Sequence, residues 1–115
     1  MQQRRTDLIL TGGENVYPSE VEAALEDMPG VTTALVLGLT DAVWGAIVTA
    51  LIVPAAGGPA VTPQALAGFL RPRLARYKSP RRFALVGQLP VTAGGKPDRS
   101  AAALDGLDLQ AVHYT

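Results

Sequence analysis

Two glycine-rich segments carry the residues of this chain that are best suited to chemistry. Segment 90–99 reads Pro-Val-Thr-Ala-Gly-Gly-Lys-Pro-Asp-Arg, and it places one lysine, Lys96, directly after Gly94 and Gly95. Because glycine has no Cβ and readily adopts positive φ, the backbone of such a turn can approach another surface closely. The lysine ammonium is a mobile cation with three donors, suited to a phosphate or carboxylate oxygen. The segment therefore predicts a cation presented to anionic reactants.

Segment 11–22 contains the other glycine turn, which is the first along the chain, and reads Thr-Gly-Gly-Glu-Asn-Val-Tyr-Pro-Ser-Glu-Val-Glu. Its two glycines, Gly12 and Gly13, are followed by a proline that suits the first position of a helix and by acids that suit the positive end of its dipole. The simplest interpretation is a hairpin turn before a helix, with Glu20 and Glu22 as helix-start acids. A glycine turn with a lysine is common on protein surfaces, so the specific signal is the pair of segments in this order.

The composition excludes several kinds of chemistry. The chain has 115 residues, 48% of them hydrophobic, which predicts one globular domain spanning residues 1–115. It has no cysteine, which removes thiolate catalysis and disulfides and is typical of a reducing compartment such as the cytoplasm. The single histidine, His113, argues against a histidine-based triad or a metal site. No apolar stretch is long enough for a membrane span, and the N-terminus lacks the pattern of a signal peptide.

The net charge is zero, but the charges are unevenly distributed along the chain. Residues 1–60 carry two basic and seven acidic side chains, whereas residues 61–115 carry eight basic and three acidic ones. Six of these basic residues lie within segment 71–82. This cluster could be a solvated helix face with its following loop, or an electropositive surface for a phosphorylated ligand. Nucleic acid is a weaker third alternative, because the overall balance is neutral and few aromatic residues are available to stack on bases.

The pattern of hydrophobic residues and helix breakers predicts an α+β domain. The elements that we expect are a strand at 7–10, a helix at 18–28, strands at 31–39 and 47–53, a helix from Thr62, a strand at 82–86 and a short helix at 98–104. Pro72 should kink or split the second helix. Because strands and helices do not alternate strictly, we expect a small β-sheet of about three main strands plus a short N-terminal hairpin, packed with two to three helices. Residues 105–115 are expected to form a loosely held tail.

With both turns in view, the chain resembles the C-terminal domain of AMP-forming acyl-CoA synthetases, the acyl- and aryl-CoA ligases of the adenylate-forming superfamily. The similarity covers about residues 4–104 and rests on GGENVYPSEVE at 12–22 and on the lysine turn. Segments 4–9 and 41–45 are most similar to o-succinylbenzoate–CoA ligases of menaquinone biosynthesis. The resemblance implies two half-reactions. A carboxylate first attacks the α-phosphate of ATP to give an acyl adenylate and pyrophosphate, and the CoA thiol then displaces AMP.

The resemblance also implies a division of labour between two domains. A large N-terminal domain binds ATP with Mg²⁺ and the acid, and the small C-terminal domain is a lid that rotates between the two steps. Lys96 matches the family's catalytic lysine for adenylate formation. A cation delivered on lid closure lowers the repulsion between the carboxylate and the triphosphate, which gives this role a physical basis. The implied partners are the N-terminal domain and a small carboxylic acid, with no nucleic acid and no membrane span.

For the thioester step, the resemblance points to the first glycine turn. Gly12 and Gly13 match the lining of the tunnel for the pantetheine arm of CoA, where backbone without side chains suits a narrow channel. Glu14 and Asn15 lie on the same turn. The remaining matches are Trp44, Tyr77 and Arg81 for the CoA nucleotide, Arg4 for the ribose of the adenylate and Thr6 for the lid hinge. An aromatic surface for adenine and an arginine for the 3′-phosphate fit the chemistry of these groups.

Several residues depart from the family's pattern or stay open. Thr6 lies at the hinge, where the family often has Asp or Lys, and Pro97 follows the lysine where an aliphatic residue is common. The chain carries no phosphate-binding loop and no acid pocket, so we expect a lid cut from a larger enzyme, inactive and without a cofactor of its own. Trp44 and Tyr77 could instead belong to the core. An alternative from another class is a non-catalytic module that docks on a separate N-terminal domain or is regulated by acylation of Lys96.

Overall fold

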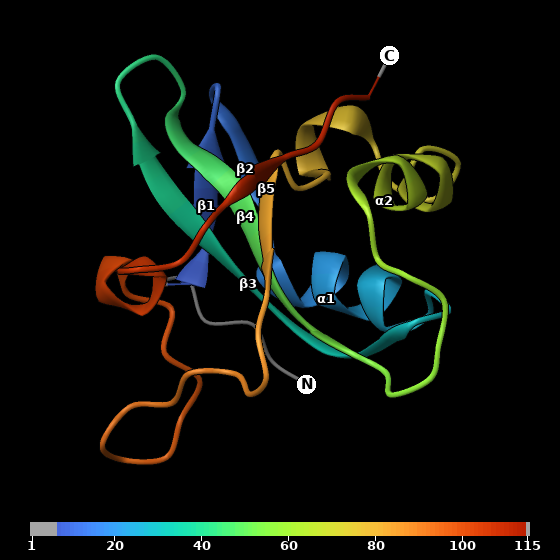
Figure 1. The fold of residues 1–115 in the computed structure, drawn as a ribbon. Coiled ribbons are helices and arrows are strands. Elements are labelled where there is room, and N and C mark those ends of the chain that lie inside the picture. The colour runs from blue at the N-terminus through green and yellow to red at the C-terminus, as the bar shows by residue number, and fades with distance from the viewer. Residues whose placement is uncertain (1–6, 115) are drawn as a thin grey trace.

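The computed structural model describes residues 7–114 of the chain. Its elements, in chain order, are β1 (Ile9–Thr11), β2 (Glu14–Val16), α1 (Pro18–Glu26), β3 (Val31–Asp41), β4 (Gly45–Pro54), α2 (Pro63–Leu70), the 3₁₀ helix η2 (Arg76–Lys78), β5 (Arg82–Leu85), the 3₁₀ helix η3 (Ala101–Leu104) and β6 (Gln110–Ala111). β1 and β2 form a separate hairpin, and the other four strands form one mixed sheet (Figure 1). The predicted α+β class is confirmed.

The long β3–β4 hairpin is the centre of the sheet. The two strands pair antiparallel from Val31 opposite Pro54 to Asp41 opposite Gly45, and their many β-branched residues and leucines favour a packed, extended backbone. β5 then lies parallel to β4, which requires the crossover connection through α2. The strand order β3-β4-β5-β6 leaves β3 as one edge of the sheet. This free edge becomes important for the lysine turn.

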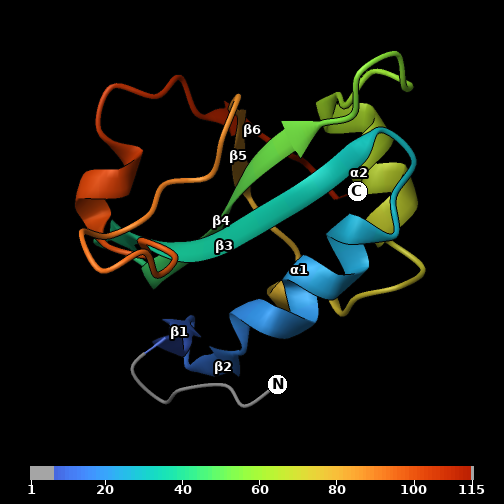
Figure 2. The same cartoon turned by 90° about the horizontal axis from the view of Figure 1, so that it is seen from below.

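Hydrophobic residues on the two faces of the sheet form two separate clusters. Val36 and Phe83 lie on the face covered by α1 and α2, whereas Leu35 and Leu51 lie on the opposite face, where η3 packs (Figure 2). The change of face between Leu35 and Val36 follows from the two-residue period of a strand. Because described residues alone form both clusters, the domain has a hydrophobic core of its own. This core supports the loops.

The second predicted helix is shorter than the hydrophobic spacing indicates. Its start is confirmed, because the Thr62 side chain caps α2 by accepting a hydrogen bond from the Ala65 backbone N–H. α2 ends at Leu70 and does not continue through Pro72 as a kinked helix, since proline has no N–H for the helical hydrogen bond. The chain resumes as η2 six residues later. The basic residues of segment 71–82 therefore lie mostly on a loop and η2, not on one helix face.

Segment 98–104 forms a 3₁₀ helix only over its last four residues. The Asp98 carboxylate accepts hydrogen bonds from the backbone N–H and the hydroxyl of Ser100, which hold the pKa of Asp98 below its ordinary value. Asp98 thus closes a turn before the helix instead of capping it.

None of the helices that the structure describes is long and apolar enough to cross a membrane.

The C-terminal tail differs from the expectation of a loosely held segment. Residues Gln110–Ala111 form β6, which pairs antiparallel with β5. The Val112 side chain is buried, and the Tyr114 hydroxyl donates a hydrogen bond to the Pro80 carbonyl at 2.7 Å. The tail is held because its backbone completes the free edge of β5, a pairing that two polar or small residues do not reveal in the sequence.

Candidate functional site

Segment 90–98 closes on itself through backbone hydrogen bonds. Thr92 N donates to the Lys96 carbonyl at 2.7 Å, Gly95 N donates to the Thr92 carbonyl at 2.9 Å, and Asp98 N donates to the Pro90 carbonyl at 3.0 Å. Gly95 has a φ of +82°, as expected for this turn, and a Cβ placed there would meet no atom within 4 Å. The lysine therefore lies on a closed turn with open space around its glycine.

The Lys96 side chain is exposed on this turn. Within residues 7–114, no hydrogen bond or ion pair holds its ammonium group. Lys96 lines an open hollow of about 240 Å³ together with Asp7, Pro97 and Arg99. A cation without a partner among the residues that the structure describes can meet an anion that comes from outside.

Arg99 fixes the end of this turn to the body of the domain. Its Nη1 donates to the Glu22 Oε2 at 2.6 Å and to the Val36 carbonyl at 2.7 Å, and its Nε lies 3.9 Å from the Asp7 Oδ2. The Arg99 and Glu22 side chains are only 20% and 14% exposed. Sequence reasoning missed this pair and interpreted Glu22 as a helix-start acid. Because 77 residues separate the two, no local pattern could have connected them.

The first glycine turn connects β1 to β2 as a two-residue hairpin loop. Gly12 and Gly13 have φ values of +56° and +84°, and consecutive positive φ values are typical of the type I′ hairpin turn. A Cβ on Gly12 would lie 2.8 Å from the Cε3 of Trp44, whereas a Cβ on Gly13 would meet nothing within 4 Å. The two glycines therefore face different surroundings, one the tryptophan ring and the other open space. Glu14 and Asn15 are exposed on β2.

Trp44 lies on the tip of the β3–β4 hairpin and outside the core. The Asp41 carboxylate accepts hydrogen bonds from the backbone N–H groups of Val43 and Trp44 at 3.0 and 2.8 Å, which shapes the tip. The Trp44 carbonyl accepts a hydrogen bond from Gly12 N at 2.9 Å, and the residue is 40% exposed. The Arg81 guanidinium lies 4.1 Å from the ring centroid, a cation–π contact. Gly12, Trp44 and Arg81 are thus brought together by three separate elements of the fold.

Tyr77 lies on η2 and is 39% exposed, so it is not a core residue. The ammonium of Lys78 lies 5.7 Å from its ring centroid and forms an ion pair with Glu20 at 3.0 Å. The hydrogen bond that Lys78 donates to this carboxylate raises the pKa of Lys78 above its ordinary value. The Tyr77 side chain is therefore accessible to a ligand at the surface.

A second hollow, of about 270 Å³, lies beside Arg81 and is lined by Arg76, Arg81, Val112, His113 and Tyr114. No carboxylate is among these lining residues, and Arg76 donates a hydrogen bond to the Tyr114 carbonyl. Burial raises the pKa of the Tyr114 hydroxyl. The C-terminal tail thus adds His113 to a basic surface. No pattern in the sequence predicts this contribution, because His113 lies far from the basic cluster along the chain.

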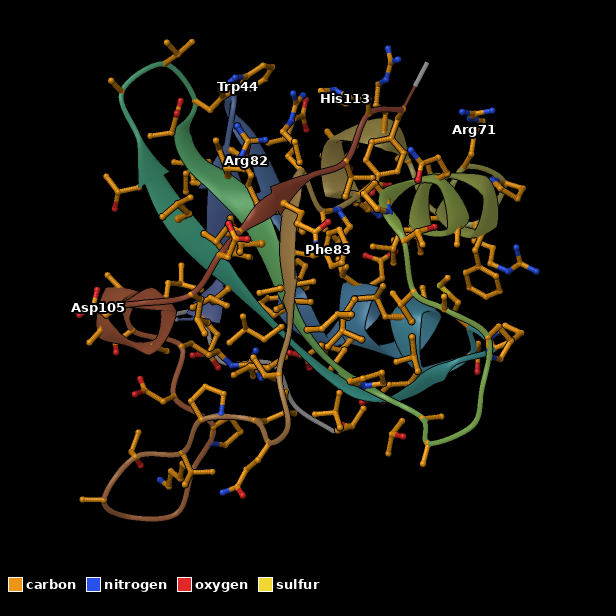
Figure 3. All side chains as sticks on the ribbon, viewed as in Figure 1. Trp44, Arg71, Arg82, Phe83, Asp105 and His113 are labelled. Atoms are coloured by element: carbon orange, nitrogen blue, oxygen red, sulfur yellow. The ribbon has the colours of Figure 1, made fainter. Side chains whose placement is uncertain are left out.

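The lysine turn and the tryptophan surface lie at opposite ends of the domain. Figure 3 labels Trp44 at the upper end of the β3–β4 hairpin, whereas the loop around residues 90–98, orange in Figure 1, lies at the lower end of the same view. The two candidate surfaces therefore cannot act at one point while the domain holds one orientation. Arg4 and Thr6, the predicted ribose contact and hinge, lie outside the described residues.

The fold and these surfaces together define a small α+β domain that presents an exposed lysine at one end and a stacked tryptophan and arginine at the other. The chain belongs to the AMP-binding enzyme C-terminal domain family, which matches residues 20–96. The expected resemblance is confirmed at this level.

Proteins with a similar sequence or fold include CoA ligases and synthetases. The chain is 43% identical over 93 residues to a feruloyl-CoA synthase from Amycolatopsis sp and 46% identical over 93 residues to a 2-succinylbenzoate–CoA ligase from Bacillus licheniformis. Each alignment covers 81% of this chain and 19% of the relative. An o-succinylbenzoate CoA synthetase from Bacillus subtilis, solved in complex with its acyl-adenylate intermediate, has a TM-score of 0.78 at 37% identity, over 96% of this chain and 22% of that one. The chain spans about a fifth of the length of the proteins that it matches.

Proposed function

We propose that this chain is the mobile C-terminal domain of an ATP-dependent carboxylic acid–CoA ligase and is inactive alone. The observation that carries the proposal is the exposed Lys96 ammonium on its closed glycine turn. No described residue neutralises this charge, so it can serve an anionic reactant bound by another domain. The relatives are about five times longer than their match to this chain, which supports an N-terminal domain of the same enzyme as the main partner.

In the first half-reaction, a carboxylate oxygen attacks the α-phosphorus of ATP, and the bond from that phosphorus to the leaving pyrophosphate breaks. Both reactants are anionic, and negative charge moves onto the bridging oxygen as the new bond forms. Lys96 supplies a cation to these oxygens when the lid closes, and closure also excludes water from the adenylate. The thin turn allows this, because Gly95 carries no side chain that would collide with the other domain.

In the second half-reaction, the CoA thiol attacks the acyl carbonyl carbon and AMP leaves. We assign this step to the opposite end of the domain, where Gly12, Gly13, Glu14 and Asn15 form the hairpin that would face the pantetheine arm. The Trp44–Arg81 pair offers an aromatic face and a cation for the CoA nucleotide, and Arg81 also lines the basic hollow. Tyr77 lies on η2, which contacts β2 of the same hairpin. A rigid rotation of the lid would present one end and then the other.

The substrates follow from the proposed reaction. They are ATP, CoA and a small carboxylic acid, and Mg²⁺ accompanies ATP. Because Mg²⁺ is bound mainly through the phosphates that it accompanies, we assign it with ATP to the N-terminal domain. Arg4 would contact the ribose and Thr6 would be the hinge. The similarity to 2-succinylbenzoate–CoA ligase makes menaquinone biosynthesis in the cytoplasm the pathway to test first.

The proposal can be tested by giving the chain an N-terminal domain. The C-terminal domain of the Bacillus licheniformis 2-succinylbenzoate–CoA ligase would be replaced by this chain, and adenylate formation would be followed by ATP–pyrophosphate exchange. Thioester formation would be followed separately, as CoA-dependent release of AMP from 2-succinylbenzoyl adenylate added from outside. We expect both half-reactions in this chimaera and neither in the N-terminal domain alone. A folded chimaera that shows no gain over the N-terminal domain in either assay would contradict the proposal.

The Trp44–Arg81 pair leads to a prediction about CoA. Replacing Arg81 with alanine should raise the KM for CoA by about tenfold or more, since a hydrogen bond to a charged group contributes roughly 1.5–3 kcal/mol. The KM for dephospho-CoA, which lacks the 3′-phosphate, should change much less. Arg73→Ala is a matched control, because Arg73 also stacks on an aromatic ring, that of Phe69 at 3.8 Å, but does not line the basic hollow. An equal rise in the KM of both thiols would show that Arg81 does not bind the 3′-phosphate.

A further inference from the structure

The lysine turn has almost no contact of its own with the core. All seven residues from 91 to 97 are exposed, and the backbone hydrogen bonds of the turn remain within segment 90–98. These bonds fix the shape of the turn but not its place on the domain. The first strong attachment after the lysine is Arg99, three residues further on, and Pro97 restricts the backbone between them.

Arg99 reaches the free edge of β3 and closes a small network there. The Val36 backbone uses both of its polar groups on this edge, because its N–H donates to the Glu22 Oε2 at 2.8 Å and its carbonyl accepts from the Arg99 Nη1 at 2.7 Å. Arg99 and Glu22 bond each other directly at 2.6 Å. One end of the lysine turn is therefore tied to α1 and to β3, the two elements that contact each other along this side of the domain (Figure 2).

The environment of this pair favours a well-defined geometry. Both side chains are largely covered, and each makes a second bond to the Val36 backbone. Removing Arg99 would leave the covered Glu22 carboxylate with only the Val36 N–H, and removing Glu22 would leave Arg99 with the longer Asp7 contact at 3.9 Å. The exposed Lys78–Glu20 pair lacks these features, because Glu20 is 46% exposed. Charge-assisted bonds with several partners hold a side chain in one place. Arg99 is thus suited to hold the end of the lysine turn at a defined position on the domain.

We propose that Arg99 and Glu22 are positioning residues for Lys96, and that they set the place from which the ammonium reaches the reacting phosphate. This inference rests on the proposed function, in which Lys96 acts in adenylate formation. A displacement of about 1 Å in a reacting group can cost on the order of 10²-fold in rate. A turn released from the β3 edge would spread the ammonium over a larger volume and lower the adenylation rate, while the opposite end of the domain would be unaffected.

The same helix provides a matched control. Glu26 lies one turn after Glu22 on α1, and its Oε2 accepts hydrogen bonds from Ala34 N at 3.2 Å and from the Thr33 hydroxyl at 2.9 Å. It therefore also pairs with the free edge of β3. No residue of the lysine turn contacts it through a hydrogen bond or ion pair in the described part of the chain. Glu22 bonds both Arg99 and the β3 edge, whereas Glu26 bonds only the β3 edge. Comparing Glu22→Gln with Glu26→Gln therefore isolates the effect of losing the contact with Arg99.

The experiment uses the chimaera and its two half-reaction assays. Arg99→Ala and Glu22→Gln should lower the kcat of adenylate formation by about 10- to 30-fold, with little change in the KM for ATP and with the thioester step within about twofold of the parent. Arg99→Lys should recover part of the loss, because lysine keeps one charged bond to Glu22. Glu26→Gln should leave both steps unchanged. Equal losses in the two steps, or equal effects of the two glutamate variants, would overturn the positioning role.

Two further measurements keep the outcomes distinct. Lys96→Ala is assayed in the same series. If Lys96→Ala does not lower the rate of adenylate formation, the proposed function is contradicted. If Lys96→Ala lowers this rate but the Arg99 and Glu22 variants do not, only the positioning role is contradicted. The second measurement is the NMR order parameter of the Gly95 and Lys96 amides in the 115-residue chain. It should fall in Glu22→Gln and stay at the parent value in Glu26→Gln. Unchanged order parameters in Glu22→Gln would overturn the proposal without any assay of activity.

Discussion

Replacing Lys96 with alanine should lower the rate of adenylate formation by about 10²–10³-fold, the cost of removing one electrostatic donor from a transition state. The attack of CoA on acyl adenylate added from outside should remain largely intact. The physical reason is the distance between the two ends of the domain, because the lysine turn and Trp44 cannot both face the reactants in one orientation (Figures 1 and 3). Pyrophosphate exchange and CoA-dependent release of AMP measure the two steps separately in the chimaera.

The chain offers its other lysine as the control. Lys78 is held by Glu20 at 3.0 Å and lies on η2, away from the lysine turn, so Lys78→Ala should leave adenylate formation at the parent rate. If Lys96→Ala reduced both half-reactions by the same factor, the division of labour between the two ends of the domain would be wrong. If it reduced neither, the lysine would have no catalytic part.

The local geometry of both turns could be predicted from the sequence. A pair of glycines flanked by polar residues allows a positive φ, and the structure places Gly12, Gly13 and Gly95 in that region. The spacing of apolar residues likewise predicted α1 and the three main strands, because burial on one face imposes a period on the chain. These features depend on neighbours within a few residues. The sequence therefore contains enough information to locate them.

The contacts that place the turns on the domain could not be predicted in the same way. Arg99 and Glu22 meet only because α1 packs along β3, and a long-range ion pair leaves no periodic trace in the chain. The sequence does not decide whether Trp44 lies in the core or on the surface for a similar reason, since its position depends on Gly12 and Arg81 from other elements. The sequence predicts a loose tail over residues 105–115, because the pairing of residues 110–111 with β5 depends on backbone groups and not on side-chain pattern.

The two glycines of the first turn should have separable roles in the thioester step. Gly13→Ala places a methyl group on the side of the hairpin where no atom lies within 4 Å, the side that would line the pantetheine tunnel. We expect the rate of thioester formation to fall by up to about 10²-fold, because even a small displacement of the thiol from the acyl carbon is costly. Adenylate formation should be retained. The two half-reaction assays on the chimaera measure this difference.

Gly12→Ala should act through Trp44 instead. Its methyl group would lie 2.8 Å from the Trp44 ring, so the ring must shift and its contact with Arg81 must change. We expect a changed tryptophan emission spectrum and a higher KM for CoA, whereas Gly13→Ala should leave the emission unchanged. The chain has one tryptophan, which makes the assignment direct.

Backbone strain is the competing explanation for both glycine variants, and Gly57 controls for it. Gly57 has a φ of +73° and open space around it, but it lies on the loop between β4 and α2. An alanine in the left-handed region costs about 1–2 kcal/mol, so Gly13→Ala and Gly57→Ala, which both have open space, should lose similar stability on thermal unfolding. Only the two hairpin variants should lose thioester formation. If Gly57→Ala lowered the rate of thioester formation as much as Gly13→Ala, a general loss of stability would explain the effect. The assignment of the hairpin to the pantetheine tunnel would then be unsupported.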